Sequence, residues 1–139
     1  MRRSNIVPQL RWLCLATFLS CVGCGEKSPT TYPVSGTVTY KGQPVEGAQV
    51  MFTSGEGRAA DGTTDAAGKF TLTTFKPGDG ALAGTHKVTV VKMVLQNSGD
   101  PYAAATNMLP TRYANSTQSP LEKAVTNGKN EFVLELTDQ

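Results

Sequence analysis

From residue 34 onward, apolar side chains recur at every second position in short segments, and turn-forming residues separate these segments. Residues 34–41 alternate in this way, with Val, Gly, Val and Tyr on one side and Ser, Thr, Thr and Lys on the other. The same alternation is found in residues 48–52, 69–74 and 130–136. A period of two places alternate side chains on opposite faces of an extended chain, so each segment is expected to be a half-buried β-strand.

The residues between these segments favour tight turns. Lys41-Gly42-Gln43-Pro44 supplies a Gly that accepts positive φ and a Pro of fixed φ, Asp65 is expected to cap a turn through its side chain, and Asn127-Gly128 is a hairpin signal. The 14 Gly and 8 Pro residues agree with many turns. We therefore predict an all-β fold, a seven-stranded antiparallel β-sandwich over residues 34–139, with strands in residues 34–41, 48–52, 58–64, 69–74, 85–95, 121–125 and 130–136.

Residues 85–95 form the longest expected strand, and they carry apolar side chains on both faces. Val88 and Val90 share one face, whereas Val91, Met93 and Leu95 share the other. This pattern predicts a central strand or a bulge near Val91. Residues 96–111 lack periodicity and are expected to be a long connection, a kind of segment that is uncommon without a function.

The first 23 residues have the layout of an export signal. Residues 1–11 are polar and carry three Arg, and residues 12–23 are an apolar run that is too short to span a bilayer. The following Val22-Gly23-Cys24 resembles a bacterial lipobox, which implies cleavage before Cys24 and acylation of its thiol with chains of the palmitate type. Cys21 stands where a Leu is usual and is a competing acceptor; the small residues before Cys24 favour Cys24. We expect a signal peptide at residues 1–23, a lipidated N-terminus and tether at residues 24–33, and the folded domain at residues 34–139.

The cysteine content and the net charge both differ between the expected leader and the expected domain. All three Cys (Cys14, Cys21 and Cys24) lie in the leader region, so the domain is predicted to have no disulfide, no Cys-based zinc site and no Cys nucleophile. Three of the thirteen basic residues also precede Cys24, leaving ten basic and eleven acidic residues, a net charge of −1. Scattered single Lys and Arg residues predict no nucleic-acid partner.

Three stretches resemble carboxypeptidase regulatory-like domains of the transthyretin-like (prealbumin) fold. They are VSGTV with KGQPVEGAQV at residues 34–38 and 41–50, TDAAGKF at residues 64–70, and GTHKVTV at residues 84–90, where His86 replaces a usual Tyr. Residues 119–136 are similar to the closing strands of short planctomycete envelope lipoproteins. The resemblance implies a prealbumin-like sandwich and no reaction, because such domains scaffold other activities.

Candidate catalytic or metal-binding residues are few. His86 is the only His, lies inside an expected strand, and is predicted to be a buried structural residue with one hydrogen bond. No G-x-S-x-G motif accompanies it, and Asp61, Asp65 and Asp79 lack calcium-loop spacing and are expected to be turn residues. We expect no enzyme activity, no cofactor, no metal and no small-molecule substrate.

Two functions remain open for an exported protein held by its lipid on the periplasmic or cell-surface side of an envelope membrane. The first is a non-catalytic module for protein–protein contact or structural support, with the long connection and an unpaired edge strand as the expected contact surfaces. The second is a carbohydrate- or peptidoglycan-binding module, which favours exposed aromatics. The expected contact residues are Tyr102, Met108 and Tyr113.

Overall fold

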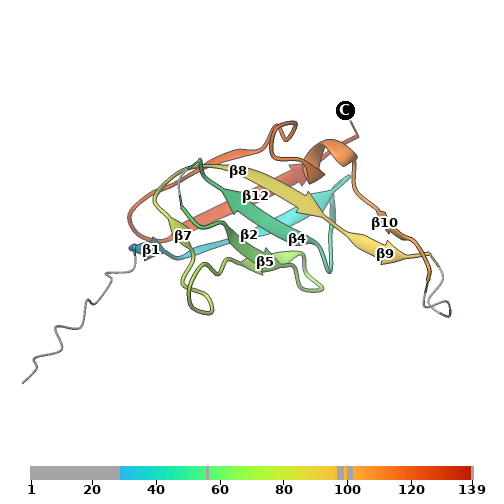
Figure 1. Cartoon of the computed structure of the whole chain (residues 1–139), viewed down its shortest axis with the longest axis horizontal. Coiled ribbons are helices and arrows are strands. Elements are labelled where there is room, and N and C mark those ends of the chain that lie inside the picture. Colours follow the sequence, from blue (N-terminus) through green and yellow to red (C-terminus); the bar gives the residue numbers. More distant parts are fainter. Residues whose placement is uncertain (1–28, 56, 97–98, 100–101, 139) are drawn as a thin grey trace, which may run out of the picture.

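The computed structural model describes residues 29–55, 57–96, 99 and 102–138, and the expected signal peptide and Cys24 lie outside these residues. Twelve strands and one 3₁₀ helix form in the described part of the chain (Figure 1). Seven strands were expected because β1, β3, β7 and β10 have only two or three residues, too few to show an alternation, and because residues 85–95, expected to be one strand, form both β8 and β9. In chain order the elements are β1 (Thr31–Tyr32), β2 (Val34–Tyr40), β3 (Gln43–Pro44), β4 (Gln49–Thr53), β5 (Ala60–Thr63), β6 (Lys69–Thr71), β7 (Ala81–Leu82), β8 (Gly84–Val91), β9 (Met93–Leu95), β10 (Ala105–Asn107), η1 (Thr111–Ala114), β11 (Glu122–Val125) and β12 (Asn130–Leu136).

Two sheets make up the body of the molecule. One has the order β12-β2-β3 with β6 also paired to β2, and the other has the order β11-β8-β4-β5. The prediction that residues 85–95 include a central strand is confirmed, because β8 pairs with both β11 and β4. The weak strand expected at residues 58–64 is the edge strand β5.

The two sheets enclose one apolar core. Phe52 of β4 lies 6.3 Å from the ring of Phe70 in β6 and 5.9 Å from the ring of Phe132 in β12, so aromatic contacts join the two sheets. Burying one such side chain stabilises the fold by roughly 1.5–3 kcal/mol. The side chains that share this core include the alternating residues expected from the sequence: Val34, Val38, Val50, Phe52, Phe70, Leu72, Val88, Val90, Leu134 and Leu136.

The expectation of a purely antiparallel sandwich needs correction. β12 runs parallel to β2 over its whole length, from Asn130 opposite Val34 to Leu136 opposite Tyr40. The Asn127-Gly128 turn does not close a hairpin either, since β11 and β12 belong to different sheets. Gly128 has the positive φ of 107° that the motif indicates, and Asn130 holds the turn by accepting a hydrogen bond from Thr126 N–H at 2.9 Å. The turn residues specify local backbone geometry, whereas the pairing of the flanking strands depends on the core.

Other turn predictions are confirmed. Lys41 and Gly42 have φ values of 53° and 78°, as a two-residue turn between β2 and β3 requires. Asp65 Oδ1 accepts hydrogen bonds from the backbone N–H groups of Ala67 and Lys69, each at 2.9 Å. These hydrogen bonds fix the backbone where β6 begins, and they therefore fix the position of Phe70 in the core.

Candidate interaction surface

The connection expected at residues 96–111 contains a strand. β10 pairs antiparallel with β9, with Ala105 opposite Leu95 and Asn107 opposite Met93, and the pair extends from the sandwich at the end opposite β1 (Figure 1). We call β9 and β10 together the ribbon. The sequence did not reveal β10 because its residues, Ala-Thr-Asn, are small or polar and show no apolar alternation.

Asn107 fixes the base of the ribbon. Its Oδ1 accepts hydrogen bonds from Lys92 N–H at 3.0 Å and from Leu109 N–H at 3.2 Å. Met108 N–H donates to the Lys92 carbonyl at 2.9 Å. Lys92 is thus the break between β8 and β9, next to the bulge position expected near Val91, and its backbone is tied to the returning chain.

The ribbon exposes large apolar side chains. Met93 is 56% exposed, Leu95 57% and Met108 59%. Five of the eight exposed large hydrophobic residues in the described part of the chain belong to the ribbon and its flanks: Met93, Val94, Leu95, Tyr102 and Met108. Singly exposed apolar residues are ordinary, whereas a group of them marks an interaction site.

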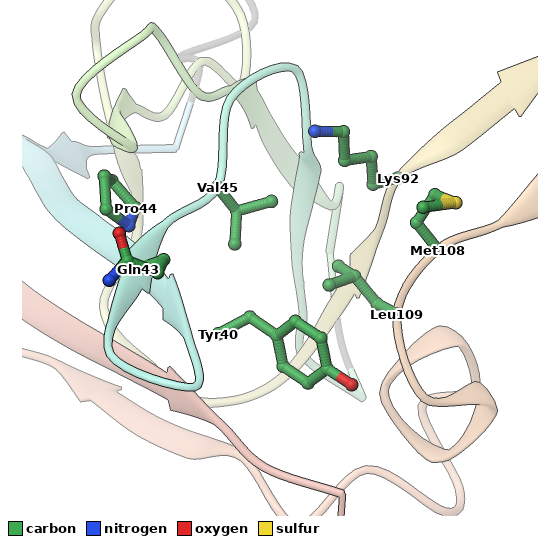
Figure 2. A pocket seen from close by; sticks show the side chains of 7 residues that line it. All are labelled: Tyr40, Gln43, Pro44, Val45, Lys92, Met108 and Leu109. Atoms are coloured by element: carbon green, nitrogen blue, oxygen red, sulfur yellow. The ribbon is translucent and has the colours of Figure 1, made fainter.

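A groove lies at the base of the ribbon, and we call it the basal groove (Figure 2). It has a volume of about 190 Å³. Val45 and Leu109 line it from opposite sides, and the ring of Tyr40 closes a third side. The complete lining consists of Tyr40, Gln43, Pro44, Val45, Lys92, Met108 and Leu109.

The C-terminal residues hold the Tyr40 wall of the groove. Tyr40 Oη donates a hydrogen bond to Asp138, and the neighbouring Lys41 Nζ lies 2.6 Å from Asp138 Oδ2. Hydrogen bonds from Lys41 and Tyr40 lower the pKa of the Asp138 carboxyl, and the bond to Asp138 raises the pKa of the Tyr40 phenol. We call Tyr40, Lys41 and Asp138 the C-terminal clasp.

The three contact residues expected from the sequence separate in the structure. Tyr102 is 92% exposed and Met108 lies on the rim of the basal groove, so both belong to the ribbon surface. Tyr113 is only 2% exposed, and its hydroxyl accepts hydrogen bonds from Arg112 at 2.8 Å and from Thr137 N–H at 3.1 Å. Its inclusion among the contact residues is therefore wrong: a Tyr in a loop segment without periodicity gives no sign that η1 turns its ring into the core.

Sequence reasoning missed Lys92, Met93, Val94 and Leu95 as surface residues. The signal was the second apolar face of residues 85–95, which predicts a central strand or a bulge. No described element covers Met93 and Leu95 of that face, and Val94 between them is also exposed. An apolar face longer than the sheet that can cover it is the feature that could have identified the ribbon.

The candidate catalytic residues lie elsewhere. His86 is fully buried, its Nε2 is 2.8 Å from the Leu82 carbonyl, and its ring packs 6.0 Å from Phe52, so the predicted buried position with one hydrogen bond is confirmed. Asp79 accepts hydrogen bonds from the N–H groups of Thr74, Phe75 and Lys76, which lower its pKa against the opposing effect of burial.

In the described ranges no three His, Cys, Asp or Glu side chains gather into a metal-binding group. The same ranges contain no helix of the length and apolarity needed to cross a membrane.

Comparisons with known proteins leave the family open. No protein-family model matches the chain, and no curated protein matches it by sequence. Among solved structures, a DUF3823 family protein from Parabacteroides merdae ATCC 43184 is similar at a TM-score of 0.41 and 13% identity, covering 78% of this chain and 47% of that one. This chain thus spans about half the length of that protein.

Two further solved structures are similar at comparable scores. A 9R-lipoxygenase from Cyanothece PCC8801 has a TM-score of 0.39 and 16% identity, over 78% of this chain and 16% of that one. The dioxygenase domain of a dioxygenase carbohydrate-binding protein fusion from Streptomyces sp. SirexAA-E has a TM-score of 0.38 and 20% identity, over 83% and 84%. Scores below 0.5 assign neither a family nor an activity.

Proposed function

We propose that this chain is a non-catalytic, lipid-anchored protein of the cell envelope that presents a β-sandwich for contact with another protein, and that the ribbon makes the contact. The observation that carries the proposal is the group of exposed apolar side chains on the ribbon and its flanks, among them Met93, Leu95 and Met108. Two strands alone are marginally stable in water, so apolar side chains on such a ribbon gain most when a partner covers them.

The start of the described chain and the ribbon lie at opposite ends of the domain. The described chain starts beside β1, whereas the ribbon extends from the far end of β8 (Figure 1). Acylation at Cys24 would hold the β1 end at the bilayer, each buried CH₂ contributing ~0.8 kcal/mol. The ribbon would then point away from the membrane toward proteins of the envelope space or the cell surface. The transthyretin-like family remains part of the proposal, carried by the sequence motifs alone.

The carbohydrate-binding alternative loses support. It depended on two loop aromatics, Tyr102 and Tyr113, as a platform for sugar rings. Tyr113 is buried, so of these two aromatics Tyr102 is the one that remains exposed. A single Tyr offers only one surface on which a sugar ring can stack. The exposed apolar side chains of the ribbon favour a protein partner instead.

The anchor is tested by metabolic labelling with an alkyne fatty acid and membrane fractionation in a bacterial host. We expect the wild-type chain to be labelled and membrane-bound, and Cys24→Ala to lose both properties. Cys21→Ala is the matched control and should keep them. A chain that stays labelled as Cys24→Ala but not as Cys21→Ala would move the anchor to Cys21, and an unlabelled cytosolic wild type would refute the anchor.

The contact is tested by a photo-crosslinking amino acid at position 95 in cells. Position 131, where Glu131 is exposed on β12, serves as the control site. We expect a crosslinked protein from position 95 only, which is lost in Met93→Ser and which the purified full chain binds saturably after its identification. Equal crosslinking from both positions, or none from position 95, would contradict the assignment of the ribbon.

A further inference from the structure

The basal groove is small, and Lys92 is the charged residue at its edge. Its volume of about 190 Å³ lies below the ~300–1,000 Å³ of small-molecule sites, so it suits a single side chain of a larger partner. Val45 and Leu109, both buried, line it from opposite sides, and Met108 joins it to the apolar surface of the ribbon. A protein segment lying along the ribbon can therefore place one apolar side chain in the groove.

Lys92 supplies the charge at the edge of the groove (Figure 2). Among the described residues, the two ion pairs are Lys41–Asp138 and Lys87–Glu122, and Lys92 takes part in neither. None of the described residues that line the groove carries a carboxylate. An apolar partner without a negative charge would partly desolvate the Lys92 ammonium without compensation, whereas a carboxylate would complement it.

We propose that the basal groove binds an apolar side chain of an extended protein segment whose adjacent carboxylate pairs with Lys92 Nζ. The inference rests on the proposed function, because it names the chemistry of the partner that the ribbon contacts. Within the described residues, β9 and β10 pair with each other and with no other strand, so the ribbon also offers edges to which an extended segment can add as a third strand.

Charge argues against a second copy of this chain as the occupant. The described residues of the ribbon and the groove contain Lys92 as a charged side chain and no acid. A two-fold pairing of ribbons would therefore bring two Lys92 side chains toward each other with no carboxylate from either ribbon. The bilayer is disfavoured by the position of the ribbon opposite β1 (Figure 1).

The test is selection of random octapeptides displayed on phage against the full chain in detergent micelles. We expect enriched peptides to carry Asp or Glu within two positions of Leu, Ile or Phe. When the same selection is made against Lys92→Glu, the enriched peptides should carry Lys or Arg in place of the acidic residue. One peptide enriched on the wild type should bind Lys92→Gln about tenfold more weakly than it binds the wild type. Lys69→Gln, an exposed Lys on β6, is the matched control and should bind as wild type.

Several results would overturn the inference. They are peptides without acid enrichment, a selection that Lys92→Glu leaves unchanged, a dimer in ultracentrifugation that Met93→Ser abolishes, or protection of β9 from hydrogen exchange in lipid nanodiscs beyond that in detergent. If the crosslink from position 95 persists while the acid preference is absent, this inference fails and the proposed function stands. If the crosslink is also absent, both fail.

Circular dichroism of each Lys92 variant checks that it is folded, which we expect because the hydrogen bonds of Lys92 come from its backbone.

Discussion

Asn107 Oδ1 accepts the backbone N–H of Lys92 at 3.0 Å, across fifteen residues of sequence. Through this bond the residue that ends β10 holds the point at which β8 passes into β9. The same oxygen accepts Leu109 N–H, so one side chain sets both the start of the ribbon and one wall of the basal groove. The ribbon is thus fixed at its base and exposed along its length.

Replacing Asn107 should loosen the ribbon without unfolding the sandwich. In Asn107→Ala the N–H groups of Lys92 and Leu109 lose their acceptor, which costs about 1–3 kcal/mol locally. We expect amide hydrogen exchange in β9 and β10 to speed up by roughly 5–150-fold, while exchange in β4 stays as in wild type. Asn107→Asp keeps an acceptor oxygen and is the control; equal protection of β9 in Asn107→Ala and wild type would refute the role.

Gly36, the glycine of β2, should not tolerate a larger residue. A Cβ at this position would lie 2.2 Å from the Phe132 carbonyl oxygen and 2.7 Å from the Phe70 ring. Gly36→Ala therefore forces β2, β6 and β12 apart, and we expect it to lower the free energy of unfolding by about 2–3 kcal/mol. Urea denaturation measures this, with Gly55→Ala, which meets nothing within 4 Å, as a control expected within about 0.5 kcal/mol of wild type. A Gly36→Ala chain as stable as the control would contradict the packing described.

The alternation of side chains predicted the core because it reports directly on burial. Val38, Phe52 and Leu134 all lie at alternating positions and are fully buried. Alternation carries no information on which strands pair, and for this reason the parallel alignment of β2 and β12 was not foreseen. That pairing depends on contacts such as Phe52 with Phe132, between residues eighty positions apart.

The ribbon could be foreseen only in part. Tyr102 and Met108 were expected as contact residues because a long connection without periodicity suggests a contact loop; both are exposed, and their contact role stays a prediction. Tyr113 was assigned wrongly because its burial depends on Arg112 and Thr137, and the contact with Thr137 spans twenty-four residues. Cys24 lies outside the described residues, and its acylation stays a prediction.

His86 should be replaceable by a ring of similar size. His86→Ala would leave a cavity beside Phe52 and is expected to cost about 3–5 kcal/mol in urea denaturation. His86→Phe keeps the ring packing and loses the bond to the Leu82 carbonyl, for an expected cost of about 1–3 kcal/mol. The ribbon crosslink from position 95 should persist in His86→Phe, whereas its loss in a folded His86→Phe chain would show that the imidazole has a role beyond packing.

The carboxylate of Asp138 in the C-terminal clasp should become protonated at a lower pH than an ordinary aspartate does. Hydrogen bonds from Lys41 and Tyr40 hold the pKa of Asp138 below the ordinary value of an aspartate in the folded chain. A carboxyl whose pKa is lowered by folding stabilises the fold at pH values above its unfolded pKa, and this contribution is lost as the pH falls through the folded pKa. Carbon-detected NMR of the Asp138 carboxyl should therefore give a titration midpoint below that of an ordinary aspartate in wild type and a higher midpoint in the double variant Tyr40→Phe, Lys41→Gln. Lys69→Gln should keep the wild-type midpoint, and a double variant that also kept it would show that the clasp does not hold the charge of Asp138.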